Sequence, residues 1–262
     1  MKILRIVLVF NLLVIMLTTS PAWAGSQQEG EPQFAIEEIA KFTKKIERNM
    51  AGKGVRVFII GRNGRPVDEL PKGVEYTHIA FGVYSKVETQ DGRIVTGYAY
   101  YNLYQSEKDG ATSSLVTDYT IDFLVNIYEP KVGIVIPTPE LQKRLLSFIG
   151  TAEYQSLHNP SYSVLSNPYN DVFQNCTEFT LDVINSSIYK TVDKDELKLA
   201  AKEHFKAYDV HISPFKVLFG SMFVSGVTKS DHDGQIKTAT FTTIAKYLEN
   251  FNLAQEVLTI DL

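Results

Sequence analysis

Gln174-Asn175-Cys176-Thr177-Glu178 holds the only cysteine of the chain and stands where an amphipathic helix is expected to begin. Asn175 is a favoured N-cap residue, which would place Cys176 in the first helical turn. Apolar residues then recur at helical spacing: Phe179, Val183, Ile184 and Ile188. The free N–H groups and the dipole of a helix start favour the thiolate, which is the nucleophilic form of cysteine. A lone cysteine also serves as a small buried hydrophobe, so a base within reach decides between the two interpretations.

The first residues predict export. Lys2 and Arg5 precede an apolar run from Ile6 to Leu17, and Ala22-Trp23-Ala24 offers a cleavage site before Gly25. This is the pattern of a secretory signal peptide over residues 1–24, and the apolar run is short for a retained membrane anchor. No later stretch is apolar enough to span a membrane, so we expect a periplasmic protein without a transmembrane segment.

The mature chain would be a single domain over residues 25–262, because no repeat, linker or domain boundary interrupts it. Loss of Lys2 and Arg5 with no acidic residue takes the net charge from −4 to −6, and no basic stripe suggests nucleic-acid binding. An unpaired thiol in an oxidising compartment has to be buried or used. The oligomeric state does not follow from the sequence.

Helices and strands are expected to be mixed along the chain. The helices are expected from Phe34 to Gly52, from Thr138 to Gly150, from Cys176, from Asp193 through Phe205, and up to about Phe251. The strands are expected at Val55–Ile60, Tyr76–Tyr84, Ile94–Leu103, Ile121–Tyr128, Val132–Ile136, Val210–Ile212 and Ile236–Phe241. A turn at Gln90–Arg93 would make a hairpin, and Ser213–Phe223 could wrap the core.

His78 is the best candidate base for Cys176, because a strand holds its ring rigidly. If the hairpin turn centres on Asp91-Gly92, His78 lies opposite a position between about Asn102 and Gln105. The amide of Asn102 could then orient the imidazole, as in Cys-His-Asn arrangements. His78 is equally well explained as a buried core histidine whose hydrogen bonds are satisfied, and Asn102 as a residue that caps the end of a strand.

The other candidates are weaker. His158 is the second choice as a base, in a turn-rich loop before the cysteine helix. Asp231-His232-Asp233 could hold a metal only weakly, because no spaced partner such as HxxxH accompanies it, and it is read as a turn or substrate-loop element. No phosphate-binding glycine loop and no GxSxG motif occurs, so neither a cofactor nor a metal is expected.

The order of His78, Asn102 and Cys176 is reversed relative to papain. The chain resembles a bacterial family of unknown function, DUF2145, and through it the circularly permuted branch of the papain-like, NlpC-type hydrolases. The matching segments are Thr77-His78-Ile79-Ala80, Tyr101-Asn102-Leu103-Tyr104-Gln105, residues 136–142, Tyr162-Ser163, residues 174–178 and Ser230-Asp231-His232. The resemblance implies an α+β papain-like core in which the cysteine helix packs on an antiparallel sheet, and a Cys176–His78 pair.

Two functions follow as expectations. The first is a periplasmic cysteine hydrolase that acts on an amide of a peptidoglycan peptide, or on an acyl ester, through Cys176, His78 and Asn102. The second is a cell-envelope binding module that kept the permuted papain-like fold without catalysis.

Overall fold

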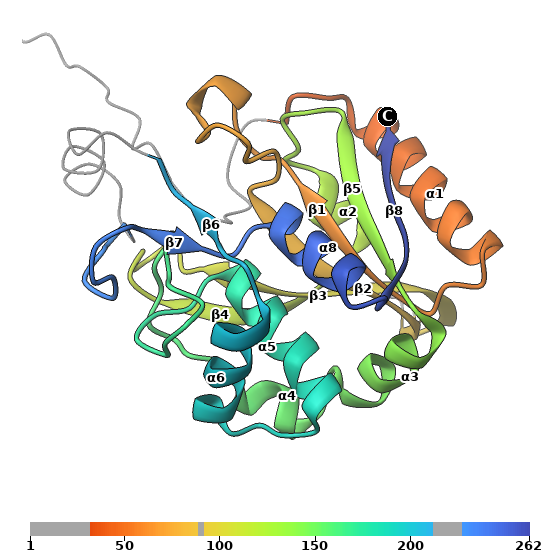
Figure 1. The fold of residues 1–262 in the computed structure, drawn as a ribbon. Coiled ribbons are helices and arrows are strands. Elements are labelled where there is room, and N and C mark those ends of the chain that lie inside the picture. Colours follow the sequence, from red (N-terminus) through yellow and green to blue (C-terminus); the bar gives the residue numbers. More distant parts are fainter. Residues whose placement is uncertain (1–31, 89–91, 212–226) are drawn as a thin grey trace, which may run out of the picture.

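A six-stranded antiparallel sheet runs through the centre of the molecule (Figure 1). The computed structural model describes residues 32–88, 92–211 and 227–262. In spatial order the strands are β4 (Ser113–Tyr119), β3 (Ile94–Gln105), β2 (His78–Glu88), β1 (Val57–Arg62), β5 (Lys131–Pro137) and β8 (Ala254–Asp261). A separate ribbon pairs β6 (Tyr208–Asp209) with β7 (Lys237–Thr238). Every residue of β1 is buried, as its position inside the sheet requires.

Helices cover both faces of the sheet because its side chains alternate between them. The first face packs α1 (Ile36–Gly52) and α2 (Thr120–Leu124) over one apolar cluster. The second face packs α3 (Pro139–Phe148), α4 (Ala152–Ser156), α5 (Cys176–Tyr189), α6 (Lys194–His204) and α8 (Phe241–Asn250) over another. A short 3-10 turn, Val67–Glu69, lies outside both layers. Cys176 and Ile79 belong to the second cluster, and Phe123 and Ala80 to the first.

Helix α5 is buried on nearly all sides, from Cys176 to Ser187. It lies between the sheet and the other helices of its face, so polar side chains in it need internal partners. Asn185 has one, since its Oδ1 accepts a hydrogen bond of 2.9 Å from the hydroxyl of Tyr247. The helix ends at Lys190, which adopts the left-handed conformation with φ 59°.

Strand β2 has ladders of different length on its two sides. The ladder with β1 continues to Arg62↔His78, whereas the ladder with β3 stops at Phe81↔Tyr101. Residues 78–80 are therefore paired with β1 but not with β3. In the paired part, Gly82 is required because the ring of Phe58 occupies the space of a side chain, 2.3 Å from an added Cβ.

The α+β class and the antiparallel sheet with packed helices are confirmed. Thr138 and Asp193 cap their helices as predicted. The strand expected at Ile121–Tyr128 is wrong: β4 precedes it, and α2 takes the first half of the range. The strand expected from Val210 begins too late, because β6 already ends at Asp209. Strand β8 was not predicted. The signal peptide, the Ser213–Phe223 wrap and the start of the Gln90 turn lie outside the described residues.

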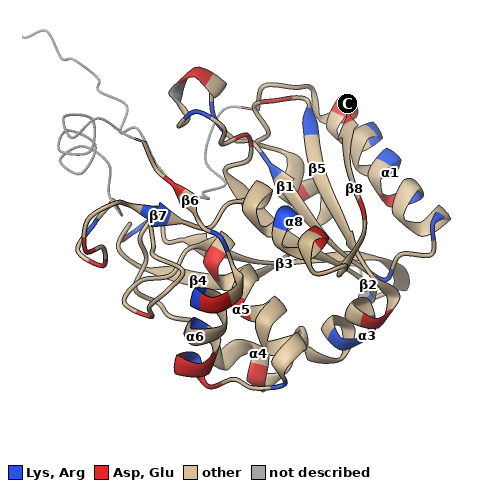
Figure 2. Ribbon diagram, viewed as in Figure 1, with Lys and Arg blue, Asp and Glu red and all other residues tan. Residues whose placement is uncertain are grey.

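Charge is mixed on the outer helices. Basic and acidic residues both occur on each of α1, α3 and α6 (Figure 2). In the described part of the chain, no helix is both long and apolar enough to cross a bilayer.

Candidate functional site

Asn175 fixes the start of the cysteine helix. Its side-chain oxygen accepts a hydrogen bond from the backbone N–H of Glu178 at 2.9 Å and another from the hydroxyl of Thr177 at 2.8 Å. Its amide group donates to the carbonyl of Val164 at 2.8 Å, which ties the cap to the preceding loop. The predicted N-cap is thus confirmed, and Cys176 is the first helical residue.

The thiol of Cys176 is surrounded by backbone donors but excluded from water. Backbone groups of Ile79, Thr177 and Cys176 itself hydrogen-bond to it, and the positive charge of Arg62 acts in the same direction. Burial outweighs these contacts, because only 5% of the residue is exposed, and raises the pKa of the thiol to about 11. At neutral pH Cys176 is therefore a protonated thiol in this structure.

His78 and Asn102 are in contact, as the hairpin geometry predicted. Nε2 of His78 lies 2.8 Å from Oδ1 of Asn102. The Asn102 amide nitrogen faces the other way, toward the carbonyls of Tyr100 (3.3 Å) and Val116 (3.2 Å) and the carboxylate of Asp118 (3.4 Å). These acceptors assign the amide nitrogen to their side and its oxygen to the ring. Nε2 of His78 must then carry the proton, which leaves Nδ1 as a bare acceptor.

The Nδ1 atom of His78 is buried and has no hydrogen-bond partner among the described residues. The ring is 1% exposed, stacks on Tyr104 at 4.6 Å between centroids and lies 5.5 Å from the ring of Phe123. Burial, and next the charge of Arg62, lower the pKa of His78 well below its ordinary value. His78 is therefore a neutral imidazole with one unused lone pair.

The backbone of Ile79 is what connects the neighbourhood of His78 to the thiol of Cys176. The β2–β3 ladder has ended at this level, and Ile79, the residue next to His78, hydrogen-bonds to the thiol. The ring of His78 packs toward Phe123, whereas Cys176 belongs to the apolar cluster of the opposite face. No hydrogen bond joins Nδ1 to the thiol in the described structure. The catalytic role of the pair stays a prediction.

Asp118 and Tyr104 extend the polar group behind Asn102. The hydroxyl of Tyr104 donates to Oδ2 of Asp118 at 2.7 Å, and the same oxygen faces the amide of Asn102. Burial raises the pKa of Asp118, while its bonds to Tyr104 and Asn102 act against that rise. Asp118 had no role in the sequence analysis, because its spacing from His78 carries no pattern.

Arg62 is the residue that sequence reasoning missed. It is the last residue of β1, 2% exposed, and stands opposite His78 across the β1–β2 ladder. Its guanidinium carbon lies 5.3 Å from the centre of the Phe123 ring. An arginine two residues after the apolar run Val55–Ile60 was the available sign, but the predicted strand ended at Ile60.

The other predicted candidates have structural partners. His158, half-buried, places Nε2 3.0 Å from the hydroxyl of Ser113, and burial and then Lys194 lower its pKa. Asp231 accepts the backbone N–H of Asn167 at 2.8 Å, and His232 contacts the carbonyl of Leu165 at 2.8 Å. Asp231 and His232 thus hold the loop before α5. Across the described residues, no group of three or more potential ligands is placed to hold a metal ion.

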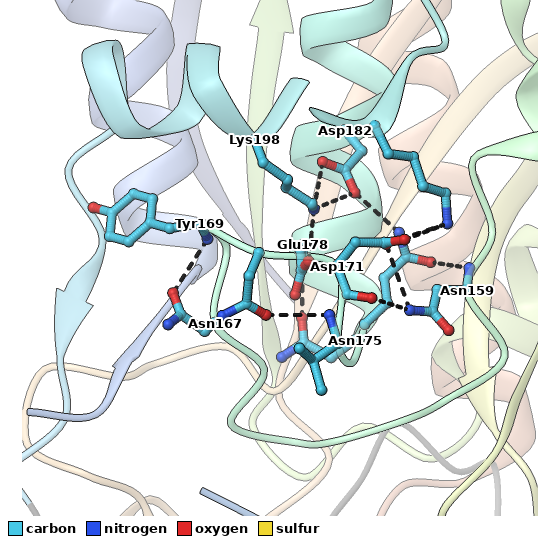
Figure 3. Close-up of polar contacts among 12 residues, drawn as sticks. Asn159, Asn167, Tyr169, Asp171, Asn175, Glu178, Asp182 and Lys198 are labelled. Atoms are coloured by element: carbon cyan, nitrogen blue, oxygen red, sulfur yellow. Dashed lines mark hydrogen bonds and ion pairs between the residues drawn. The ribbon is translucent and has the colours of Figure 1, made fainter. Parts of the chain in front are cut away.

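A buried ion cluster joins α5, the helix that begins with Cys176, to α6 (Figure 3). Lys198 of α6 reaches Glu178 at 2.7 Å and both carboxylate oxygens of Asp182 at 2.8 Å. Gln174 adds a bond to Asp182 at 3.0 Å. Two carboxylates share one ammonium group, and burial raises the pKa of Glu178. Glu178 thus links the first turn of α5 to α6.

The comparisons identify the family. The family model of DUF2145, described as "uncharacterized protein conserved in bacteria", matches residues 49–248, and the chain belongs to this family. The match covers Arg62, His78, Asn102 and Cys176. Searches among curated proteins and among solved structures gave no significant match.

Proposed function

We propose that this DUF2145 protein is a cysteine hydrolase, with Cys176 as nucleophile, His78 as general base and Asn102 as the residue that orients His78. The observation that supports it is the bare Nδ1 of His78, which is buried and has no hydrogen-bond partner among the described residues. A buried nitrogen without a hydrogen bond is costly, so its retention needs a reason. Proton transfer from Cys176 supplies one.

The proposed reaction proceeds through a thioester. Nδ1 of His78 takes the thiol proton as the sulfur attacks the carbonyl carbon of an amide or ester. Backbone N–H groups at the helix start stabilise the oxyanion, and His78 returns the proton to the leaving amine or alcohol. Water, deprotonated by His78, then cleaves the thioester and restores the thiol. The proposed location is the periplasm, because the leader predicted at residues 1–24 would export the chain; a peptidoglycan peptide is the proposed amide and an acyl ester the alternative.

The resting site has a neutral thiol and a neutral imidazole. The pKa of Cys176 is raised to about 11 and that of His78 is lowered, so a preformed thiolate–imidazolium pair is unfavourable. Proton transfer must accompany attack, as with a serine nucleophile. Because Cys176 is 5% exposed, a substrate has to displace its neighbours before the carbonyl reaches sulfur.

The same burial favours a second candidate. A water-excluded thiol with a raised pKa and no hydrogen bond to His78 is what a cell-envelope binding module would keep as part of its core. In that case His78 and Asn102 would be a buried polar pair that fixes the end of β2.

Acylation by p-nitrophenyl acetate separates the two functions. The hydrolase should release a burst of one equivalent of p-nitrophenolate, with acetyl on Cys176 by mass spectrometry. His78→Ala should slow that burst by about 10²-fold or more, the usual contribution of a general base. His158→Ala is the matched control and should keep the rate. Equal rates for wild type and folded His78→Ala would favour the binding module.

A further inference from the structure

Helix α1 exposes a row of basic side chains, which we call the basic ridge (Figure 2). The ridge consists of Lys41, Lys44, Lys45 and Arg48, all of them exposed. Their spacing is i, i+3, i+4 and i+7, which places residues on one side of a helix. The residues of α1 that are buried on the opposite side are Ile39, Phe42, Thr43, Ile46 and Met50. The four bases are separated along the chain, so only the helical register brings them together.

The acids of α1 do not neutralise the ridge. Glu38 accepts a backbone N–H at the helix start at 3.0 Å, and Glu47 accepts a hydroxyl of α2 at 2.7 Å. Among the described residues, no carboxylate forms an ion pair with a member of the ridge. Lys45 donates to the backbone carbonyl of Asp261 at 2.7 Å, which leaves its charge unbalanced. Glu37 remains, one acid against four bases.

The ridge is opposite in sign to the chain as a whole. The sequence carries a net charge of −4, and the ridge alone contributes four positive charges. On the other face of the sheet, Arg144 of α3 is paired with Glu140. Lys194 of α6 is likewise paired with Asp171. A patch of one sign on a chain of the opposite net charge attracts an anionic partner at that patch and repels it elsewhere, so it fixes the orientation of binding.

The shape of the ridge fits a flat anionic surface. A helix rises 1.5 Å per residue, so the ridge is about 10 Å long, and a plane can meet all four charges at once. The single aromatic residue of α1, Phe42, is buried, so the helix exposes no ring on which a nucleic-acid base could stack. The apolar side of α1 is already packed in the core, so contact with the surface would be electrostatic.

We propose that the basic ridge of α1 docks the protein on a lipid bilayer that carries anionic phospholipid headgroups. The ammonium and guanidinium groups would contact the phosphate groups of the lipids. Helix α1 covers one face of the sheet and the helix that begins with Cys176 lies on the other. Docking would therefore turn the face that carries α5 away from the membrane. The inference does not depend on the proposed hydrolase.

Co-sedimentation with lipid vesicles tests the docking surface on the full chain. We expect the protein to bind vesicles of phosphatidylglycerol, which is anionic, more tightly than vesicles of zwitterionic phosphatidylcholine. The preference should be present at about 0.01 M salt, where the Debye length is about 30 Å, and lost near about 1 M, where it is about 3 Å. All variants keep the same N-terminus, so its contribution to binding cancels in the comparison.

The double variant Lys44→Gln/Arg48→Gln removes two charges of the ridge. Each basic residue near an anionic bilayer contributes about fivefold in affinity, so this variant should bind phosphatidylglycerol vesicles about 25-fold more weakly. Lys143→Gln/Lys202→Gln is the matched control, because it removes two exposed charges from α3 and α6, on the other face of the sheet. The two variants have the same net charge, and the control should bind as the wild type does. Circular dichroism checks that both are folded.

Three outcomes would overturn the proposal. The first is equal binding of the wild type to the two lipids at low salt. The second is equal weakening in the two double variants, which would mean that net charge alone matters. The third is ridge-dependent binding of a soluble polyanion such as heparin without binding of vesicles, which would assign the ridge to a soluble polymer.

Discussion

Replacement of Lys198 by methionine tests what the buried ion cluster contributes. Lys198 is 5% exposed, and its ammonium group contacts Glu178 at 2.7 Å and both oxygens of Asp182 at 2.8 Å. Methionine fills much of the same volume without the charge. The substitution leaves two carboxylates together in the interior, at 0% and 3% exposure. Each must then stay ionised without a counter-ion or take up a proton.

The expected loss is large. Removal of one partner from a buried ion pair costs about 3–5 kcal/mol, because the remaining charge is unpaired. For a domain of this size 1 kcal/mol lowers Tm by about 2–4 °C, so the loss corresponds to roughly 6–20 °C. Lys194→Met on the same helix is the matched control. Its ion pair with Asp171 spans 3.0 Å with side chains 29% and 31% exposed, so we expect at most about 1 kcal/mol.

Urea unfolding at pH 7, followed by circular dichroism, gives both values. A Lys198→Met protein no less stable than Lys194→Met would refute the reasoning, since it would mean that the ammonium group of Lys198 does not balance buried negative charge. A smaller loss at pH 5 than at pH 7 is also expected, because protons then replace the missing ammonium charge.

Three further predictions concern single side chains. Because the pKa of Glu178 is raised, the folded state binds more protons than the unfolded state, and the free energy of unfolding falls as pH rises from about 4.5 toward 8. Glu178→Gln should flatten this pH dependence, measured by urea titrations. Gly82→Ala should cost about 1–3 kcal/mol, because its Cβ would lie 2.3 Å from the Phe58 ring, whereas Gly97→Ala, with no atom within 4 Å, should cost little. Asn102→Ala should slow acylation of Cys176 by at least about tenfold while the protein stays folded, and unchanged acylation would remove Asn102 from the mechanism.

Local rules explain which parts of the fold the sequence predicted. Asn175, Thr138 and Asp193 are side-chain caps whose effect is confined to one turn, so the starts of α5, α3 and α6 were predictable. The hairpin of β2 and β3 follows from alternation around one turn, and it gave the contact between His78 and Asn102.

The errors arise where burial overrides a short pattern. The apolar run that begins at Ile121 is compatible with strand or helix, and the packing of Phe123 against the α1 cluster decides for α2. The edge strands β4 and β8 are only partly buried, so their sequences carry little continuous apolar signal. Arg62 could not be recognised as part of the site from the sequence, because that depends on its position beside His78. His78 comes 16 residues later in the chain, and only the β1–β2 register brings the two residues opposite each other.

The same long-range contacts determine how the site can work. A helix start alone would favour a thiolate at Cys176, yet burial raises its pKa to about 11. Three features of the site act against that rise: the backbone of Ile79, the N–H groups of the first turn, and Arg62. In the proposed hydrolase, attack by a protonated thiol would therefore depend on His78 as base, and the unpartnered lone pair on its Nδ1 would accept the proton.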